Sequence, residues 1–256
     1  MVDPTQPYDE LAPYYDQIFE NWEASIMRQA TVLASILNRE CGDSRPIRVL
    51  DCACGIGTQS LGLAARGFDV TGSDASSGAI QRARSEASKR GLNIRFSVAN
   101  MVQLSEIAQS SFDAVICLDN SLPHLETDEE LLQATRQVYG RLRPGGSFVG
   151  SIRDYDQLIV ERPTSQGPSF YSDSGGRRVV FQIWDWLDER RYRFHLYITR
   201  STESAWQTFH FTSTYRALLR SELRHILEHA GFTNVRWLSP SETGFYQPIF
   251  IARRSC

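Results

Sequence analysis

The sequence has no run of the roughly 18–20 apolar residues that a membrane-spanning helix needs. Its first twenty residues are acidic and aromatic, without the basic start and apolar stretch of a secretory signal. Basic residues are not in excess, because 27 Lys and Arg face 30 Asp and Glu and the net charge is −3. Since binding to nucleic-acid phosphates needs clustered Lys and Arg, we expect neither a membrane nor a nucleic acid as partner.

Cysteine is also scarce, with five residues scattered along the chain. Cys52 and Cys54 are too close in sequence for an ordinary disulfide, so we expect reduced thiols and a cytoplasmic location. Internal repeats and low-complexity segments are absent. The 256 residues, 41% hydrophobic and 22% charged, are enough for one large globular domain with a full core.

Between residues 47 and 152, short apolar runs alternate with helical patterns. Strands are predicted over 47–52, 68–73, 94–99, 112–118 and 147–152, and helices over 58–66, 76–90 and 131–142. Ser76 is the expected N-cap of the second helix. This strict alternation predicts an α/β fold with a doubly wound, Rossmann-like parallel sheet that helices cover on both faces.

The regions on either side of this core have different patterns. Residues 8–41 predict an N-terminal helical lid rich in aromatic side chains, and residues 153–215 predict an inserted antiparallel β cap. Within the cap, residues 178–187, 191–199 and 205–214 predict three strands. In the second of them, the alternation from Tyr192 to Ile198 predicts one apolar and one polar face. Residues 216–256 predict a closing helix, with Gly231 in the C′ position, and two final strands, 232–238 and 246–252. We expect all these parts to form a single domain, 1–256.

The glycine-containing stretch VLDCACGIGTQSL, residues 49–61, follows the first predicted strand. Gly55 and Gly57 allow a tight turn and close approach of a ligand, and the next helix begins with free N–H donors. Asp74 ends the following strand, where a carboxylate can accept both hydroxyls of an adenosine ribose. A nicotinamide site is the rival interpretation, but it would need a third glycine where Ser60 stands. An empty crevice in a purely structural domain is the other alternative.

These residues resemble the class I S-adenosylmethionine-dependent methyltransferases, through DCACGIG at 51–57, VTGSD ending at Asp74, and LRPGG at 142–146. The match is sharper to the glycine N-methyltransferase branch, with its sarcosine and dimethylglycine relatives. DNSLPHL at 119–125, SIRDYD at 151–156 and the pair Asn100 and Met101 are similar to that branch. The resemblance implies a methyltransferase of small molecules with S-adenosylmethionine as its cofactor.

The resemblance also implies which residues bind the cofactor. Asp74 would hold the ribose, Ala75 and Asn100 would lie beside the adenine, Leu118 would lie near the cofactor's amino end, and Arg28 would hold its carboxylate. Met101 stands where the branch has an aromatic residue. The complete implied set is Arg28, Asp51, Ala53, Gly55, Gly57, Asp74, Ala75, Asn100, Met101 and Leu118.

The acceptor site is expected at the ends of the fourth and fifth strands. In the resembling branch, the arginine that matches Arg153 binds an amino-acid carboxylate, and a guanidinium suits that ligand. A salt bridge to a neighbouring aspartate, Asp154 or Asp156, is the alternative. Asn120 can donate to and accept from an amino acid, or it can serve the turn it lies in. Tyr15, in the lid with Tyr14 and Trp22, can cover a cation, although plain packing explains such aromatics equally well.

The histidines allow a second chemistry. His124 follows the fourth strand, while His195 and His210 belong to the cap; each is a candidate general base if the acceptor is a hydroxyl or a ring N–H. His225 and His229 are four residues apart on a helix, but no third ligand is near, so we expect them at the surface and no metal site. The candidate catalytic set is therefore Asn120, Arg153, His124 and Tyr15.

The function expected from the sequence is S-adenosylmethionine-dependent methyl transfer to the amine nitrogen of a small, carboxylate-bearing, glycine-like metabolite. The alternative is an O-, C- or ring-N-methyltransferase of a small aromatic metabolite with a histidine base. A module that binds the cofactor without catalysis is a third hypothesis. Because the glycine N-methyltransferase branch includes oligomers, a homo-oligomer is also among the expectations.

Overall fold

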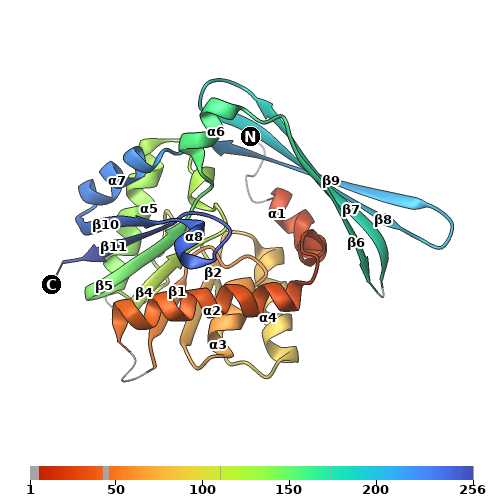
Figure 1. Ribbon diagram of the computed structural model, residues 1–256. Helices are drawn as coiled ribbons and strands as arrows, with labels where there is room; N and C mark the ends of the chain where they lie inside the picture. Colours follow the sequence, from red (N-terminus) through yellow and green to blue (C-terminus); the bar gives the residue numbers. More distant parts are fainter. Residues whose placement is uncertain (1–5, 43–45, 110, 174, 256) are drawn as a thin grey trace.

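The computed structural model describes residues 6–42, 46–109, 111–173 and 175–255. Its strands form a seven-stranded and a four-stranded sheet, and Figure 1 shows the smaller sheet projecting from one side of the molecule. The larger sheet has the order β10-β11-β5-β4-β1-β2-β3. Its strands are β1 (Arg48–Asp51), β2 (Asp69–Asp74), β3 (Arg95–Val98), β4 (Phe112–Cys117), β5 (Leu142–Ser151), β10 (Phe232–Leu238) and β11 (Ile249–Arg254).

The pairing in this sheet confirms the predicted architecture. Strands β1 to β5 are parallel to their neighbours among themselves, whereas β11 is antiparallel to both β5 and β10. In a parallel sheet the carboxyl ends of the strands meet at one edge, and ligands of open α/β sheets bind there. The ends of β1, β2, β4 and β5 therefore define where the site must be sought.

Helices cover both faces of the larger sheet, as predicted. The helices of one face are α2 (Trp22–Cys41), α3 (Thr58–Ala64) and α4 (Ser77–Lys89); those of the other are α5 (Asp128–Arg141) and α7 (Arg220–His229). Val49 shares a buried cluster with Leu33 of α2, while its neighbour Leu50 shares one with Leu131 of α5 and Leu223 of α7. Because consecutive strand residues point to opposite faces, such strands must be apolar throughout.

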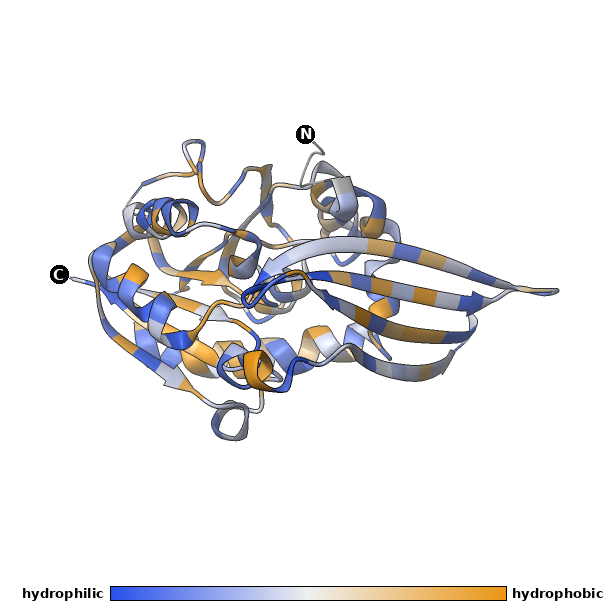
Figure 2. Cartoon of the chain, turned by 90° about the horizontal axis from the view of Figure 1, so that it is seen from above, coloured by the Kyte–Doolittle hydropathy of each residue, from blue (hydrophilic) through white to orange (hydrophobic). Residues whose placement is uncertain are grey.

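The second sheet is the predicted cap. It consists of β6 (Ser165–Asp173), β7 (Gly176–Trp186), β8 (Arg191–Ser201) and β9 (Trp206–Arg216), all antiparallel, and helix α6 (Tyr155–Glu161) precedes it. The predicted alternation is confirmed, because Tyr192, Leu196 and Ile198 are buried while Arg191 and Arg193 are exposed. Figure 2 shows the same alternation of hydropathy along these strands.

The sequence prediction omitted two of these elements. Strand β6 is an exposed edge strand whose pairing with β7 shifts between Gln166 and Ser169, so it carries no buried alternation to detect. Helix α6 has one fully buried residue, Tyr155, and therefore shows little apolar periodicity. The short helices η2 (Leu122–His124) and α8 (Pro240–Thr243) were also not expected.

Several predicted boundaries are close to the observed ones. Ser76 caps α4 by accepting a hydrogen bond from the Ala79 N–H, and Gly231, with φ +101°, follows the end of α7. The helix expected over 131–142 ends at Arg141, and the strand expected from residue 147 begins at Leu142. The last strand begins at Ile249 rather than residue 246.

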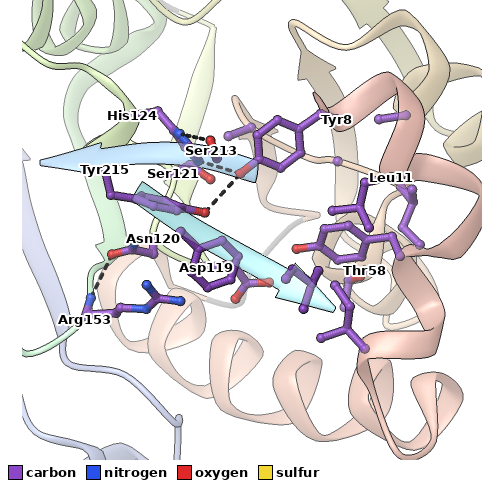
Figure 3. A pocket seen from close by; sticks show the side chains of 18 of the residues that line it. Tyr8, Leu11, Thr58, Asp119, Asn120, Ser121, His124, Arg153, Ser213 and Tyr215 are labelled. Carbon is purple, nitrogen blue, oxygen red and sulfur yellow. Dashed lines mark hydrogen bonds between the residues drawn. The ribbon is translucent and has the colours of Figure 1, made fainter. Parts of the chain in front are cut away.

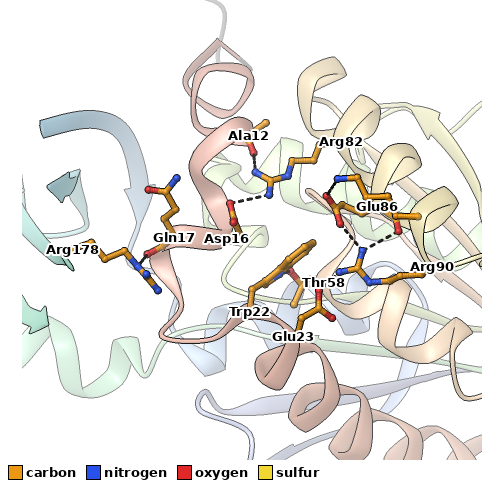
Figure 4. Close-up of polar contacts among 11 residues, drawn as sticks. Ala12, Asp16, Gln17, Trp22, Glu23, Thr58, Arg82, Glu86, Arg90 and Arg178 are labelled. Carbon is orange, nitrogen blue, oxygen red and sulfur yellow. Dashed lines mark hydrogen bonds and ion pairs between the residues drawn. The ribbon is translucent and has the colours of Figure 1, made fainter. Parts of the chain in front are cut away.

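The N-terminal region is helical, but it is broken into three pieces. Helix α1 (Gln6–Leu11) continues into the 3₁₀ helix η1 (Ala12–Ile18), and α2 begins after Asn21, whose side chain accepts from the Ala24 N–H. Of the lid expected over 8–41, helix α2 packs on the larger sheet, so only the segment before it, residues 6–21, is called the lid from here on. Two arginines hold this segment (Figure 4). Arg82 of α4 donates to Ala12 O and pairs with Asp16, and Arg178 of β7 donates to carbonyls at the end of η1. The lid thus bridges the larger sheet's helices and the cap.

Candidate functional site

The carboxyl ends of the parallel strands open into a cavity of about 1520 Å³. The lid contributes Tyr8, Leu11 and Tyr15 to its wall, and the inner face of the cap contributes Phe194 and Tyr215. Its remaining walls come from the loops that follow β1, β2, β4 and β5. The cavity therefore lies where the parallel topology predicts a ligand site.

The loop after β1 turns as the glycine motif predicts. Gly55 has φ +51° and Gly57 has φ +96°, backbone conformations that side-chain-bearing residues rarely adopt. A Cβ on Gly57 would also lie 3.3 Å from Leu61 and 3.5 Å from Ala83. The space around Gly55 is open, because a Cβ added there would meet no atom within 4 Å. Glycine at 57 is thus required by packing and backbone, and glycine at 55 leaves the loop clear on its cavity side.

Asp74 is held at the end of β2 by backbone groups. Its carboxylate accepts hydrogen bonds from the N–H of Gly55 at 2.8 Å and from the N–H of Ser76 at 2.9 Å. Burial raises the pKa of Asp74, and these two donors partly oppose that shift. No arginine, lysine or histidine in the described parts of the chain forms an ion pair with it. The carboxylate is therefore oriented but not neutralised.

Most of the predicted cofactor residues line this cavity. They are Arg28, Ala53, Gly55, Asp74, Ala75, Asn100 and Met101. Arg28 projects from α2 and is exposed, and Asn100 uses its side-chain oxygen to accept from the Val102 N–H.

Three predicted cofactor residues lie behind the cavity wall instead. Leu118 is 2% exposed and packs in the cluster with Leu33 and Leu37 of α2, and Gly57 forms the N-terminal end of α3. Asp51 is fully buried, accepts a hydrogen bond from Ser60 Oγ at 2.7 Å, and has its pKa raised to about 7 by burial. These residues lie behind the cavity wall and support its loops. The spacing of a sequence motif does not distinguish a residue behind the wall from one that lines the cavity.

Arg153 follows β5 and lines the cavity among aromatic rings. Its guanidinium carbon lies 4.5 Å from the ring centre of Trp184, 5.1 Å from that of Phe194 and 5.4 Å from that of Tyr215, and one of its N–H groups donates to Tyr192 Oη at 2.7 Å. Arg153 does not form the salt bridge to Asp154 or Asp156 that was the alternative prediction. Asp154 and Asp156 pair with Arg220, at 2.5 and 3.5 Å.

No carboxylate among the residues that the structure describes pairs with Arg153. Its surroundings are aromatic faces and a hydroxyl, which favour a cation but leave its charge without a counter-ion. A half-buried cation of this kind needs an anionic partner. An anionic group in the cavity would supply the missing counter-charge.

Asn120 is buried at the end of β4 and already has partners in the protein. Its side-chain oxygen accepts from the Arg153 N–H at 3.0 Å, and its amide donates to Tyr155 Oη at 2.9 Å. Tyr155 Oη in turn lies 2.9 Å from Tyr192 Oη. Asn120 thus holds the backbone of Arg153 and the hydroxyl network around its guanidinium; direct contact of Asn120 with an acceptor stays a prediction.

His124 lies in a second polar group on the cavity wall (Figure 3). Its Nε2 lies 2.6 Å from Tyr8 Oη, which lies 3.1 Å from Tyr215 Oη, and its Nδ1 lies 3.4 Å from Ser213 Oγ. Burial, with the nearby charge of Arg153, lowers the pKa of His124 to about 4. At neutral pH this imidazole is uncharged and able to accept a proton.

Of the other aromatic and histidine candidates, some line the cavity and others do not. Tyr15 lines the cavity, whereas Tyr14 packs on Phe209 of the cap, with ring centres 4.2 Å apart, and Trp22 donates to Thr58 Oγ1. His195 and His210 bond to each other at 2.9 Å, away from the cavity wall, so they are not candidate bases.

Histidines 225 and 229 are exposed, as predicted. In the described ranges, no three His, Cys, Asp or Glu side chains come together as a metal site. Across those same ranges, no helix combines the length and the apolar character needed to cross a membrane.

Asp119 and Tyr8 are among the cavity residues that were missed from the sequence. Asp119 precedes Asn120 in a turn where both residues have positive φ, +55° and +68°. Consecutive left-handed residues other than glycine are a recognised mark of functional turns, but backbone conformation is not visible in a sequence. Tyr8 reaches His124 across 116 residues of chain, and no local pattern signals such a contact.

Comparison with known proteins agrees with this geometry. The methyltransferase domain family matches residues 49–146. The chain is 26% identical over 227 residues to the glycine/sarcosine N-methyltransferase of Aphanothece halophytica, covering 89% of this chain and 80% of that protein. It is 37% identical over 151 residues to the glycine/sarcosine N-methyltransferase of Parasynechococcus marenigrum, covering 59% of this chain and 52% of that protein.

Among solved structures, the fold is similar to that of CalS10 from Micromonospora echinaspora, an amino pentose methyltransferase with bound S-adenosylmethionine. The TM-score is 0.74 at 20% identity, and the superposition covers 90% of this chain and 92% of that one. At this level of identity the likeness concerns the fold alone.

Proposed function

We propose that the protein, a class I S-adenosylmethionine-dependent methyltransferase that resembles the glycine/sarcosine N-methyltransferase branch, methylates the amine nitrogen of a small, carboxylate-bearing metabolite. The observation that carries this proposal is Arg153, a cavity guanidinium without a carboxylate partner among the described residues. Planar guanidinium geometry matches a carboxylate through two parallel hydrogen bonds. An acceptor bound there would be an amino acid or a similar amino-carboxylate.

The residues of the cavity fit the cofactor. The open space at Gly55 and the oriented carboxylate of Asp74 are the features that an adenosine ribose requires. Asp74 would hold the ribose hydroxyls, Ala75, Asn100 and Met101 would line the adenine, and Arg28 would meet the carboxylate. When bound, S-adenosylmethionine supplies a methyl group activated by its sulfonium.

The chain's own part in the reaction is positioning and exclusion of water. Arg153 fixes the acceptor carboxylate, and the rings of Trp184, Phe194 and Tyr215 keep that end of the cavity dry. The lid residues Leu11 and Tyr15 cover the opposite side. A neutral amine contributes its own lone pair, so a nitrogen–carbon bond forms as the sulfur–carbon bond breaks, and the amine releases one proton.

A second candidate function rests on His124. Among the five histidines, all of them in the described ranges, only His124 lines the cavity, where it is bonded to Tyr8. It is therefore the candidate general base for an acceptor with a hydroxyl, an acidic carbon or a ring N–H. The aromatic cavity wall would then hold a small aromatic metabolite. This is the O-, C- or ring-N-methyltransferase alternative, and it uses the same cofactor site.

An acceptor screen by mass spectrometry separates the two candidates. Purified protein and methyl-labelled S-adenosylmethionine are incubated with glycine, sarcosine, dimethylglycine, other amino acids, and a panel of phenols, azoles and aromatic amines. Label on an amino acid supports the proposal. Label on aromatic acceptors alone contradicts it and favours the His124 alternative.

Arg153→Ala then tests the carboxylate contact. We expect the KM for the amino-acid acceptor to rise about tenfold or more, because a charge-assisted pair is lost, while binding of S-adenosylhomocysteine changes less than about twofold. Arg162→Ala is the matched control, since Arg162 also lies over a tryptophan ring, Trp186, but is exposed and outside the cavity. Unchanged KM and kcat in Arg153→Ala would contradict the proposal.

A further inference from the structure

Asp119 is a cavity carboxylate that the proposed function does not yet use. It follows β4, which lies between β1 and β5 in the sheet, so it stands between the cofactor loop after β1 and Arg153 after β5 (Figure 3). The side chain is half-buried. Its position places a negative charge between the two binding regions of one cavity.

The partners of this carboxylate are neutral. One oxygen accepts from Gln59 Nε2 at 2.7 Å and the other accepts from the Tyr246 hydroxyl. No Lys, Arg or His side chain within the described ranges pairs with it. Neutral donors orient a carboxylate without cancelling its charge, and burial raises the pKa of Asp119 while the two donors oppose that rise. A half-buried charge in this state needs a positive partner from outside the protein.

The turn that contains Asp119 has an unfavourable backbone conformation. Asp119 and Asn120 both have positive φ, a conformation that non-glycine residues adopt at a penalty. The turn is held by Ser151, whose Oγ accepts from the Asp119 N–H at 3.0 Å and itself donates to Gln247 Oε1 at 2.8 Å. The backbone conformation that directs the Asp119 side chain into the cavity is therefore less stable than an ordinary turn.

Gln59 connects Asp119 to the helix beneath the lid. The Gln59 amide donates to Gln29 Oε1 of α2 at 2.7 Å as well as to Asp119, and Gln29 donates to Ser25 Oγ at 3.1 Å. This chain of neutral groups fixes both the direction and the distance of the carboxylate. It is a prearranged acceptor for a cation rather than a flexible surface charge.

We propose that Asp119 binds an ammonium group inside the cavity. This inference rests on the proposed methyltransferase function. In such an enzyme two ligands carry an ammonium group into the cavity: S-adenosylmethionine, through its α-ammonium, and the acceptor, through its amine before that amine loses its proton. With Arg153, Asp119 gives the cavity one negative and one positive group that lack counter-ions among the described residues. That pattern complements a zwitterion, the charge state of an amino acid at neutral pH.

The test measures binding and turnover in Asp119→Asn, which keeps the size and shape of the side chain and removes its charge. Asparagine tolerates positive φ better than other side-chain-bearing residues, so the turn is preserved. Glu129→Gln is the matched control, because Glu129 is exposed and outside the cavity. Tyr246→Phe removes a hydrogen bond to the carboxylate but leaves its charge.

The first arm titrates S-adenosylhomocysteine and its analogue without the α-amino group, using calorimetry without any acceptor. If Asp119 meets the cofactor ammonium, Asp119→Asn weakens binding of S-adenosylhomocysteine about tenfold or more. Binding of the analogue without the α-amino group then changes by less than about twofold. The second arm measures KM for the acceptor found by the label screen. If Asp119 meets the acceptor amine, KM rises about tenfold while binding of S-adenosylhomocysteine is unchanged.

The inference is overturned if Asp119→Asn changes neither quantity, or if Glu129→Gln produces the same change. Failure of the proposed function is distinguishable, because the first arm needs no turnover. If the screen shows label only on hydroxyl or carbon acceptors, the amine source is eliminated and the first arm alone decides the role of Asp119. Tyr246→Phe is expected to weaken the same ligand as Asp119→Asn, by a smaller factor.

Discussion

Asp74, Asp119 and Arg153 line the same cavity, but the fold gives each a different set of partners. Backbone N–H groups orient Asp74, neutral side chains orient Asp119, and aromatic rings surround Arg153. None of the three meets an opposite charge among the described residues. His124 differs from them, because burial removes its charge instead of leaving it unpaired. Charged and uncharged groups at the site are thus set by local surroundings rather than by residue type.

At the residue scale we predict a pH effect from His124. Its pKa is lowered from 6.5 to about 4 by burial, so between these values the unfolded chain binds a proton that the folded chain does not. The free energy of unfolding should therefore fall as pH drops from about 6.5 to about 4. His124→Asn should lose this part of the dependence. Urea unfolding at pH 7 and pH 4.5 measures the difference.

His225→Asn is the control for that experiment, because His225 is exposed on α7. It should keep the wild-type pH dependence. An identical pH dependence in His124→Asn and in wild type would show that the histidine titrates normally in the folded protein.

At the scale of elements, the lid is joined to both neighbouring parts by arginines. Arg178 is 8% exposed and donates to the carbonyls of Gln17, Phe19 and Glu20, at 3.1, 2.7 and 2.9 Å. These carbonyls lie at and just after the end of η1, where a helix leaves its last acceptors unsatisfied. Since Ile18 and Phe19 line the cavity, the same contacts fix one part of its wall.

We predict that Arg178→Ala loosens the lid and speeds ligand release. The dissociation rate of S-adenosylhomocysteine, followed by tryptophan fluorescence in stopped flow, should rise about tenfold because three hydrogen bonds from a charged donor are lost. Arg177→Ala is the control, since Arg177 lies over the exposed ring of Trp206. A dissociation rate equal to that of wild type would contradict this role of Arg178.

At the scale of the whole molecule, the cavity is the place where lid, parallel sheet and cap meet. Leu11 and Leu196 share a buried cluster that joins lid to cap, and Ala12, Ile56 and Ala79 share another that joins lid to the parallel-sheet unit. A ligand that fills the cavity would therefore contact all three parts at once. Binding should stabilise the assembled state and not only the loops of the site.

We predict that S-adenosylhomocysteine raises the melting temperature and protects the lid from proteolysis. At a concentration of about one hundred times Kd the stabilisation is about 2.7 kcal/mol, a rise of about 5–10 °C for a chain of this size. Asp74→Asn should abolish most of the rise. Asp69→Asn, at the opposite end of β2, should respond like wild type; an equal response in Asp74→Asn would contradict the assigned cofactor site.

The sequence predictions were accurate where a feature depends on residues close together in the chain. Alternating and continuous apolar runs correctly predicted the strands of the parallel sheet and three strands of the cap, and Ser76 correctly predicted a helix start. Strand β6 was missed because it is exposed at a sheet edge. Seven of ten expected cofactor residues line the cavity. Six of them end or follow parallel strands, which necessarily finish at one edge of the sheet, and the seventh, Arg28, lies on α2.

The amino-acid sequence by itself determined the order of the parallel strands and the helices between them, the glycine turn and the edge of the sheet where the cavity lies. These depend on periodicity and backbone sterics within a few residues. Only the tertiary structure decided that His124 rather than His195 faces the cavity, that Arg220 takes the aspartates next to Arg153, and that Asp119 meets neutral partners. Each of these outcomes depends on partners far along the chain, as with Tyr8 and His124, 116 residues apart. Such partners are chosen by packing of whole elements, which no local pattern encodes.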